Sequence, residues 1–134
     1  MNLPKQKLTP FLSFSGNAEE AMEHYTKVFD AKIESIVYFE AGGLGDDGKV
    51  LNGLMDFDGF KLIFMDMPAA HPAPDFSWAN SLFMSFESEA AFDKAFAGIS
   101  EGGTVMMGPE AVNEIRKCTW VIDKYGVTWQ LVWK

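Results

Sequence analysis

The side chains that could do nucleophilic or acid–base chemistry are few in this 134-residue chain, and they are far apart in sequence. It contains two histidines, His24 and His71, and one cysteine, Cys118. No serine has a histidine base near it in sequence, and Cys118 has only Arg116 and Lys117 as basic neighbours, so the chain shows no nucleophile motif. We predict no catalytic residue here. Cys118 reads as a small buried hydrophobe in a strand, with a reactive thiol as the alternative.

The histidines also make a poor metal site. His24 falls on a predicted helix face that should be half exposed, and His71 lies in a proline-rich segment. Their expected roles are therefore a solvated surface and a loop. The alternative is an unusual metal site that combines His71 with Asp66 or Asp75.

Charge and hydropathy exclude several classes of partner. The formal net charge is -8 and the few basic residues are scattered, whereas a nucleic-acid site needs a concentrated basic face. We expect no nucleic-acid partner. The first residues lack the apolar core of a signal peptide, and no stretch approaches the roughly 18 apolar residues that span a membrane. The expected location is the cytoplasm.

The first half of the chain predicts one helix and four strands. Asn17 is a suitable helix N-cap, with Glu20 three residues on as in a capping box, and Asp58-Gly59 is typical of a two-residue hairpin turn. The predicted helix carries an apolar stripe that must pack on a sheet. The predicted elements are strands over 8–14, 33–39, 50–57 and 60–66 and a helix from 17 to 29.

The second half repeats this plan. Ser88 is the predicted N-cap of the second helix, Ala91 belongs to its predicted apolar face, and Gly108-Pro109 is expected in a loop. The predicted strands cover 81–86, 104–107, 115–123 and 127–133. We predict a single domain of two modules, with module one over about 8–67, a linker over about 68–77 and module two over about 78–134.

Matching residues support a duplicated unit. Phe11–Phe14 (FLSF) aligns with Phe83–Phe86 (FMSF), and the two closing hairpins turn at equivalent places around Asp58-Gly59 and Lys124–Gly126. Coincidence among short apolar strands is the alternative, but the shared order of strand, helix, strand and hairpin favours duplication.

Four segments in a fixed order carry a family resemblance: Pro10–Tyr25, Trp78–Phe83, Glu101–Gly103 and Asp123–Leu131. With these segments the chain resembles the vicinal-oxygen-chelate superfamily, which includes glyoxalase I, bleomycin-resistance proteins and extradiol dioxygenases, and in particular its PhnB-like branch. The resemblance implies an α+β fold, in which two βαβββ modules form a curved mixed sheet. It also implies a homodimer, with or without exchange of a module between chains.

The same branch often carries the label 3-demethylubiquinone 3-methyltransferase, which implies binding of S-adenosylmethionine. A glycine-rich turn for such a cofactor should join a strand to a helix, but Gly42–Gly45 precedes an acidic loop. The sequence does not support the methyltransferase label, and we expect no cofactor.

Enzymes of the superfamily hold a divalent cation with one His, Glu or Gln from each of four strands. The resemblance places the four ligand positions at Thr9 or Pro10, at Ile63, at Ser81 and at Gln130. Only Gln130 retains a suitable donor, and one amide cannot hold a catalytic ion, because hard cations need several oxygen ligands. We therefore expect no metal.

In a strand every second side chain points to the same face, so Thr9, Phe11 and Ser13 share one face of the predicted sheet. The repeat places their counterparts Ser81, Phe83 and Ser85 on the equivalent face in the second half. The resemblance adds residues from the closing hairpins, so that an aromatic cleft with a few hydroxyl and amide groups is expected. Simple core or dimer-interface packing is the alternative for these aromatic rings. The predicted cleft consists of Thr9, Phe11, Ser13, Ile63, Ser81, Phe83, Ser85, Trp120 and Gln130.

The sequence thus predicts a PhnB-like protein that binds a small organic molecule without a catalytic metal. The alternative is a metal-dependent lyase or dioxygenase of the glyoxalase superfamily that uses non-standard ligands.

The last predicted strand also has a face opposite to that of Gln130. On this face lie Trp129, Leu131 and Trp133, and we expect them to pack against a helix.

Overall fold

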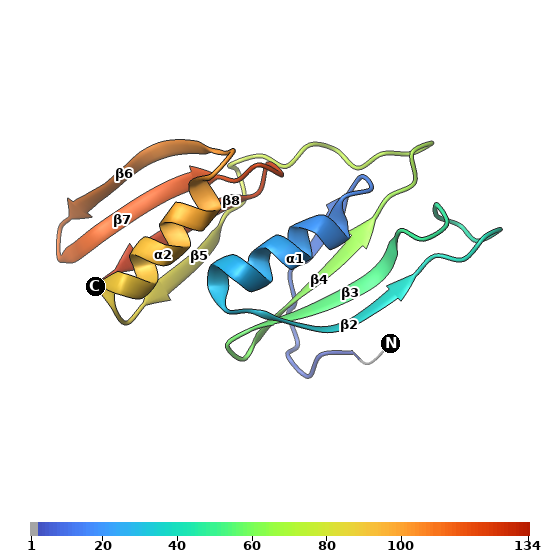
Figure 1. Cartoon of the computed structure of the whole chain (residues 1–134), viewed down its shortest axis with the longest axis horizontal. Coiled ribbons are helices and arrows are strands. Elements are labelled where there is room, and N and C mark those ends of the chain that lie inside the picture. The colour runs from blue at the N-terminus through green and yellow to red at the C-terminus, as the bar shows by residue number, and fades with distance from the viewer. Residues whose placement is uncertain (1–2) are drawn as a thin grey trace. The chain divides into compact units, whose positions relative to one another are not determined.

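Two four-stranded mixed sheets, each with one helix, account for the regular structure of residues 3–134, the part of the chain that this computed structural model describes. The chain divides into two compact units, unit 1 up to Pro74 and unit 2 over Asp75–Lys134. Figure 1 shows α1 lying along one face of the sheet of unit 1 and α2 along one face of the sheet of unit 2. The α+β class is confirmed.

In unit 1 the strand order is β1-β4-β3-β2, with β1 parallel to β4 and the other pairs antiparallel. The β3–β4 turn was predicted correctly: Asp58 and Gly59 both have positive φ, 55° and 98°, as the tightest two-residue hairpin requires. The elements are β1 (Phe11–Phe14), α1 (Ala18–Phe29), β2 (Lys32–Tyr38), β3 (Val50–Phe57) and β4 (Phe60–Asp66).

Unit 2 has the same topology. Its order is β5-β8-β7-β6, with β5 parallel to β8, so the predicted repeat of strand, helix and three further strands is confirmed. The elements are β5 (Leu82–Phe86), α2 (Glu89–Ser100), β6 (Thr104–Val112), β7 (Ile115–Ile122) and β8 (Thr128–Trp133).

The core of unit 1 lies between α1 and its sheet. Tyr25 and Met22 of α1 are fully buried, as is Phe64 of β4, and the ring of Phe64 stacks on that of Phe14 with 5.8 Å between centroids. Each such side chain contributes about 1.5–3 kcal/mol when fully buried. The predicted apolar stripe of the first helix is therefore the face that holds the unit together.

The core of unit 2 is built in the same way. Phe92 of α2 is fully buried and meets Phe86 edge to face, and Trp129 and Leu131 are buried on the helix side of β8, as predicted. Ala91 is a correction, since it is exposed rather than part of the apolar face. The buried residues of α2 are Phe92, Ala95 and Ile99, which share one side of the helix. Ala91 comes one residue before Phe92, so its side chain points away from the sheet.

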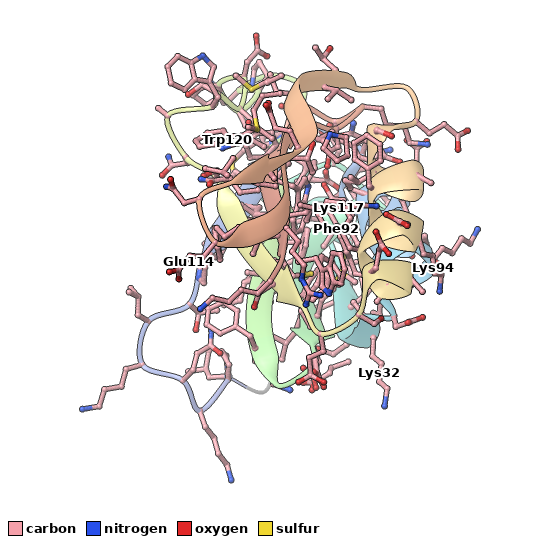
Figure 2. All side chains as sticks on the ribbon, turned by 90° about the vertical axis from the view of Figure 1, so that its left-hand side faces the viewer. Lys32, Phe92, Lys94, Glu114, Lys117 and Trp120 are labelled. Carbon is pink, nitrogen blue, oxygen red and sulfur yellow. The ribbon has the colours of Figure 1, made fainter. Side chains whose placement is uncertain are left out.

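Lys117 of β7 links this sheet to α2 at the edge of the core. Its ammonium group pairs with Glu89 and Asp93 at 2.9 and 2.8 Å and lies 5.8 Å from the centre of the Phe92 ring, which is labelled beside it in Figure 2. The hydrogen bonds to Asp93 and Glu89 raise the pKa of Lys117, so the pairing persists over the whole neutral range.

Three sequence predictions about elements need correction. Leu8 lies outside the first strand, which starts at Phe11, although Pro10 still accepts a hydrogen bond from Ile63. The predicted loop at Gly108-Pro109 belongs instead to β6, which runs to Val112. The strand accommodates this pair through irregular register and a positive φ of 74° at Gly108, where any Cβ would meet the Cys118 carbonyl at 2.1 Å.

The third correction concerns the start of α1. Asn17 occupies the N-cap position, but its side chain makes no capping hydrogen bond. The carboxylate of Asp66 at the end of β4 takes this role, accepting from the amides of Gly16 and Ala18 at 2.8 and 3.0 Å and from that of Val50 at 3.0 Å. One buried acid thus joins the ends of three elements of unit 1.

The predicted linker is held to unit 1 over its first part. The amide of Met67 donates to the Phe14 carbonyl, that of Ala69 to Asp46 and that of Ala73 to the Ser15 hydroxyl. Within residues 3–134 no helix has both the length and the apolar character needed to cross a membrane.

We predict that Asp66→Ala destabilises the protein by about 3 kcal/mol, because three amides that it satisfies lose a charged acceptor. Chemical denaturation followed by circular dichroism measures this change. Asp47→Ala, in the exposed β2–β3 connection, is the matched control and should leave the free energy of unfolding unchanged. Equal effects of the two substitutions would contradict the capping role of Asp66.

Candidate ligand-binding faces

Each sheet has one face against its helix and one face without a helix, which we call its open face. In unit 2 the register sets Phe83 of β5 opposite Gln130 of β8, Gln130 opposite Trp120 of β7, and Trp120 opposite Met107 of β6. Paired residues of neighbouring strands point to the same side of a sheet. These four side chains therefore form one row across the open face.

The middle of this row is polar and its end is exposed. The amide nitrogen of Gln130 donates to the hydroxyl of Ser81, just before β5, at 2.8 Å. Phe83 is 62% exposed, while Gln130 and Trp120, the latter labelled in Figure 2, are half-buried. Ser85 lies two residues beyond Phe83 on the same face and is exposed.

The open face of unit 1 has an equivalent row with different chemistry. Phe11 of β1 lies opposite Ile63 of β4, Ile63 opposite Leu54 of β3, and Leu54 opposite Ser35 of β2. Phe11 is 49% exposed, whereas Ile63 and Leu54 are buried at 9% and 4%. The centre of this row is thus an apolar floor.

The other residues predicted for unit 1 flank this row. Ser13 is half-buried and lies opposite Met65, on the same face as Phe11. Thr9 precedes β1, is half-buried, and its hydroxyl donates to the Gln6 carbonyl. The structure therefore brings Phe11, Ser13 and Ile63 together within unit 1, and Ser81, Phe83, Ser85, Trp120 and Gln130 together within unit 2.

Sequence reasoning missed two polar residues of the unit 1 open face. The Asn52 carbonyl oxygen and the Ser35 hydroxyl are buried without a hydrogen-bond partner. Register shifts between Ile33 and Ser35 in β2 and near Val37 decide which of these residues reach the open face. The sequence signal that could have identified Asn52 as a residue of this face is its position as an isolated polar residue within an apolar strand.

Cys118 of β7 lies on the open face of unit 2, opposite Glu110 of β6 and Val132 of β8. It is buried, as predicted from its strand context. Burial raises the pKa of the Cys118 thiol, and the negative charge of Glu110 raises it further. The thiol is therefore protonated at neutral pH and is a weak nucleophile there.

The donor set does not fit a metal of the superfamily type. Among the described residues no three His, Cys, Asp or Glu side chains cluster as ligands. At the predicted ligand positions Ile63 is a buried hydrocarbon, and Gln130 already bonds Ser81. Asp66, the proposed partner of the exposed His71, gives its oxygens to three amides. We derive no step through a metal.

In each unit the first strand pairs in parallel with the last, and the last two strands form a closing hairpin. Two such βαβββ units define a protein of the vicinal-oxygen-chelate class. The model of the 3-demethylubiquinone-9 3-methyltransferase family matches residues 6–132, and the chain belongs to this PhnB-like family. No protein of curated function matches it.

Solved structures agree with this assignment. The chain is 35% identical to a PhnB protein from Bacillus cereus, with a TM-score of 0.87 over 96% of this chain and 100% of the other. It is 23% identical to protein PA1353 from Pseudomonas aeruginosa, with a TM-score of 0.86 over 97% and 98% of the two chains. The fosfomycin resistance protein FosX from Mesorhizobium loti shares the fold at 13% identity, with a TM-score of 0.60 over 97% and 92%.

The residues present do not fit the S-adenosylmethionine site that the family description implies. Gly42–Gly45 lies in the connection between β2 and β3, and no helix follows it. A phosphate- or nucleoside-binding glycine turn works by placing a helix N-terminus at the ligand, which this position does not do. We derive no methyl-transfer step.

We predict that alkylation of Cys118 by iodoacetamide has a pH midpoint above 9.0, and that Glu110→Gln moves this midpoint to lower pH by removing the facing negative charge. Mass spectrometry of the protein after short exposures measures the rate at each pH. Glu114→Gln, in the exposed β6–β7 turn labelled in Figure 2, is the control and should leave the midpoint unchanged. A wild-type midpoint below 9.0 would contradict the account of Cys118.

Proposed function

We propose that this protein binds a small organic molecule on the open faces of its sheets, without a metal of the superfamily type. The observation that carries the proposal is the placement of Phe11 and Phe83 at equivalent positions of the two open faces, 49% and 62% exposed. Exposed rings beside a few fixed polar groups are the usual composition of a small-molecule site.

The polar groups on these faces support binding rather than core packing. A pure packing face has no use for the half-buried, hydrogen-bonded pair of Gln130 and Ser81, because polar groups taken out of water cost free energy unless they find partners. A ligand with hydrogen-bonding groups pairs with the donor and acceptor that this pair leaves unused, whereas apolar packing does not.

The alternative is a metal-dependent lyase or dioxygenase with other ligands. A FosX protein from Listeria monocytogenes with the fold of this chain, at 12% identity, is known in complex with Mn(II) and a dihydroxypropylphosphonic acid. A catalytic role of this kind requires an ion bound through several protein donors. Elemental analysis after supplementation with Mn, Fe, Ni or Zn distinguishes the two functions, and a stoichiometric ion would favour the enzyme.

Ligand binding is tested by a thermal-shift screen of small aromatic and polar metabolites, with tryptophan fluorescence as the second readout. We expect compounds that raise the melting temperature, and we expect Phe83→Ala to weaken their binding about tenfold through loss of stacking. Phe60→Ala, which removes another exposed ring, 52% exposed at the β3–β4 turn, should leave affinity unchanged. A screen without hits, or hits that bind both variants equally, would overturn the proposal.

We also propose that the protein is a cytoplasmic homodimer. Both arrangements of this dimer, with and without exchange of a module between chains, are compatible with the proposal. Several large apolar side chains outside the rows above are exposed, among them Leu8 and Trp78 at 86% and 62%, and such surface is typical of a protein–protein contact. Light scattering during gel filtration should give twice the 14.9 kDa mass of the chain. A mass of one chain at micromolar concentration would contradict the dimer.

A further inference from the structure

We infer that the open face of unit 2 holds a neutral planar ring between Phe83 and Trp120, and that an edge of this ring with adjacent N–H and C=O groups, as in a lactam, faces Gln130. This inference rests on the proposed function and specifies its ligand class. It follows from the order of three side chains in one row and from the hydrogen bonds that remain available to the central one.

The spacing of the row suits a ring. Neighbouring strands lie about 4.8 Å apart, so Phe83 on β5 and Trp120 on β7, with β8 between them, start about 10 Å apart. Stacked aromatic rings prefer centroid distances of about 4.5–7 Å, so one ring inserted between them can approach both. Gln130, directly between the two aromatic residues in the register, then lies under the edge of the inserted ring.

These two rings are available for stacking. On the helix side of the same sheet Phe86 and Phe92 meet edge to face, and Phe92 stacks with Phe96. Among residues 3–134 neither Phe83 nor Trp120 takes part in a ring pair. Their flat surfaces therefore remain for a ligand.

The amide of Gln130 determines which edge it recognises. A primary amide has two N–H donors and one carbonyl acceptor. One donor of Gln130 is used by Ser81 at 2.8 Å, which leaves one N–H and the carbonyl for a ligand. The complementary partner presents an acceptor beside a donor, which is the arrangement of a lactam.

The duplicated unit provides an internal comparison. At the equivalent positions unit 1 has Ile63 in place of Gln130 and Leu54 in place of Trp120, both buried. The centre of this row can contact apolar groups but offers no amide to a polar edge. The lactam-binding function therefore belongs to unit 2.

Charge indicates a neutral ligand. Phe83, Gln130, Trp120 and Met107 carry no charge, and the ionisable group facing this part of the sheet from β6 is Glu110, opposite Cys118 in the neighbouring row. An anion on this face would meet the carboxylate of Glu110 without a cationic partner in the row, which would disfavour it.

The test uses 2-quinolinone, a planar lactam, and N-methyl-2-quinolinone, which lacks the N–H donor, with the full-length protein and isothermal titration calorimetry. We expect 2-quinolinone to bind and the N-methyl compound to bind at least about tenfold more weakly, since an unpaired amide carbonyl is left behind. In Gln130→Met, 2-quinolinone should lose this advantage, so that the two compounds bind alike.

Two further variants separate stacking from edge recognition. Phe83→Leu should weaken both compounds by a similar factor, and Phe60→Leu should change neither. Circular dichroism and melting temperature establish that each variant is folded. Equal binding of both compounds to the wild-type protein, or a preference that survives in Gln130→Met, would overturn the lactam assignment while leaving the proposed function in place. No binding of 2-quinolinone also overturns it, and the metabolite screen then decides the proposed function separately.

Discussion

One helix for each four-stranded sheet is the constraint on which the rest of this structure depends. A single helix covers one face of a sheet, and Tyr25 and Phe92 show how completely it does so. The opposite face receives no helix from its own unit. Strand alternation then sends every second side chain of all four strands to a surface that something else must cover. The candidate ligand faces are a direct consequence of this arrangement.

The duplicated backbone separates what the fold requires from what the chemistry requires. Both units keep a phenylalanine on the outer parallel strand, Phe11 and Phe83, and both bury aromatic rings under the helix. The centre of the row differs, with Ile63 in one unit and Gln130 in the other. Since the local strand pairing is the same, the difference cannot come from the fold, and it gives the two open faces different surface chemistry.

At the positions where the family resemblance places cation ligands, this chain carries neutral side chains. Ile63 contributes only dispersion, and Gln130 with Ser81 forms a neutral hydrogen-bonded pair. Neutral amides and hydroxyls orient a ligand but do not polarise it as a cation does. These groups fit the proposed recognition through stacking and hydrogen bonds, and Gly42–Gly45 does not form the cofactor turn that the methyltransferase description implies.

Local features were predictable from the sequence because local interactions decide them. The Ser88 cap, whose hydroxyl accepts the Ala91 amide, and the Asp58-Gly59 turn each involve residues at most three apart. Alternation likewise placed Phe11, and the repeat placed Phe83, on faces away from the helices, while the family resemblance added Gln130. The repeated order of these elements, together with the four segments that carry the family resemblance, was enough to predict the α+β fold and the family.

Tertiary structure alone decided the rest, because the interactions join residues distant in sequence. The helix α1 is capped by Asp66, 48 residues away from Ala18, and local rules selected Asn17 instead. Bulges in β2 and β3 bring Ser35 and Asn52 to the open face, and pairing with β7 carries β6 past Pro109. The sequence by itself determined the order of the helices and strands and the alternation of their side chains. Only the folded chain determined which of those side chains meet, since strand register is set by the partner strand.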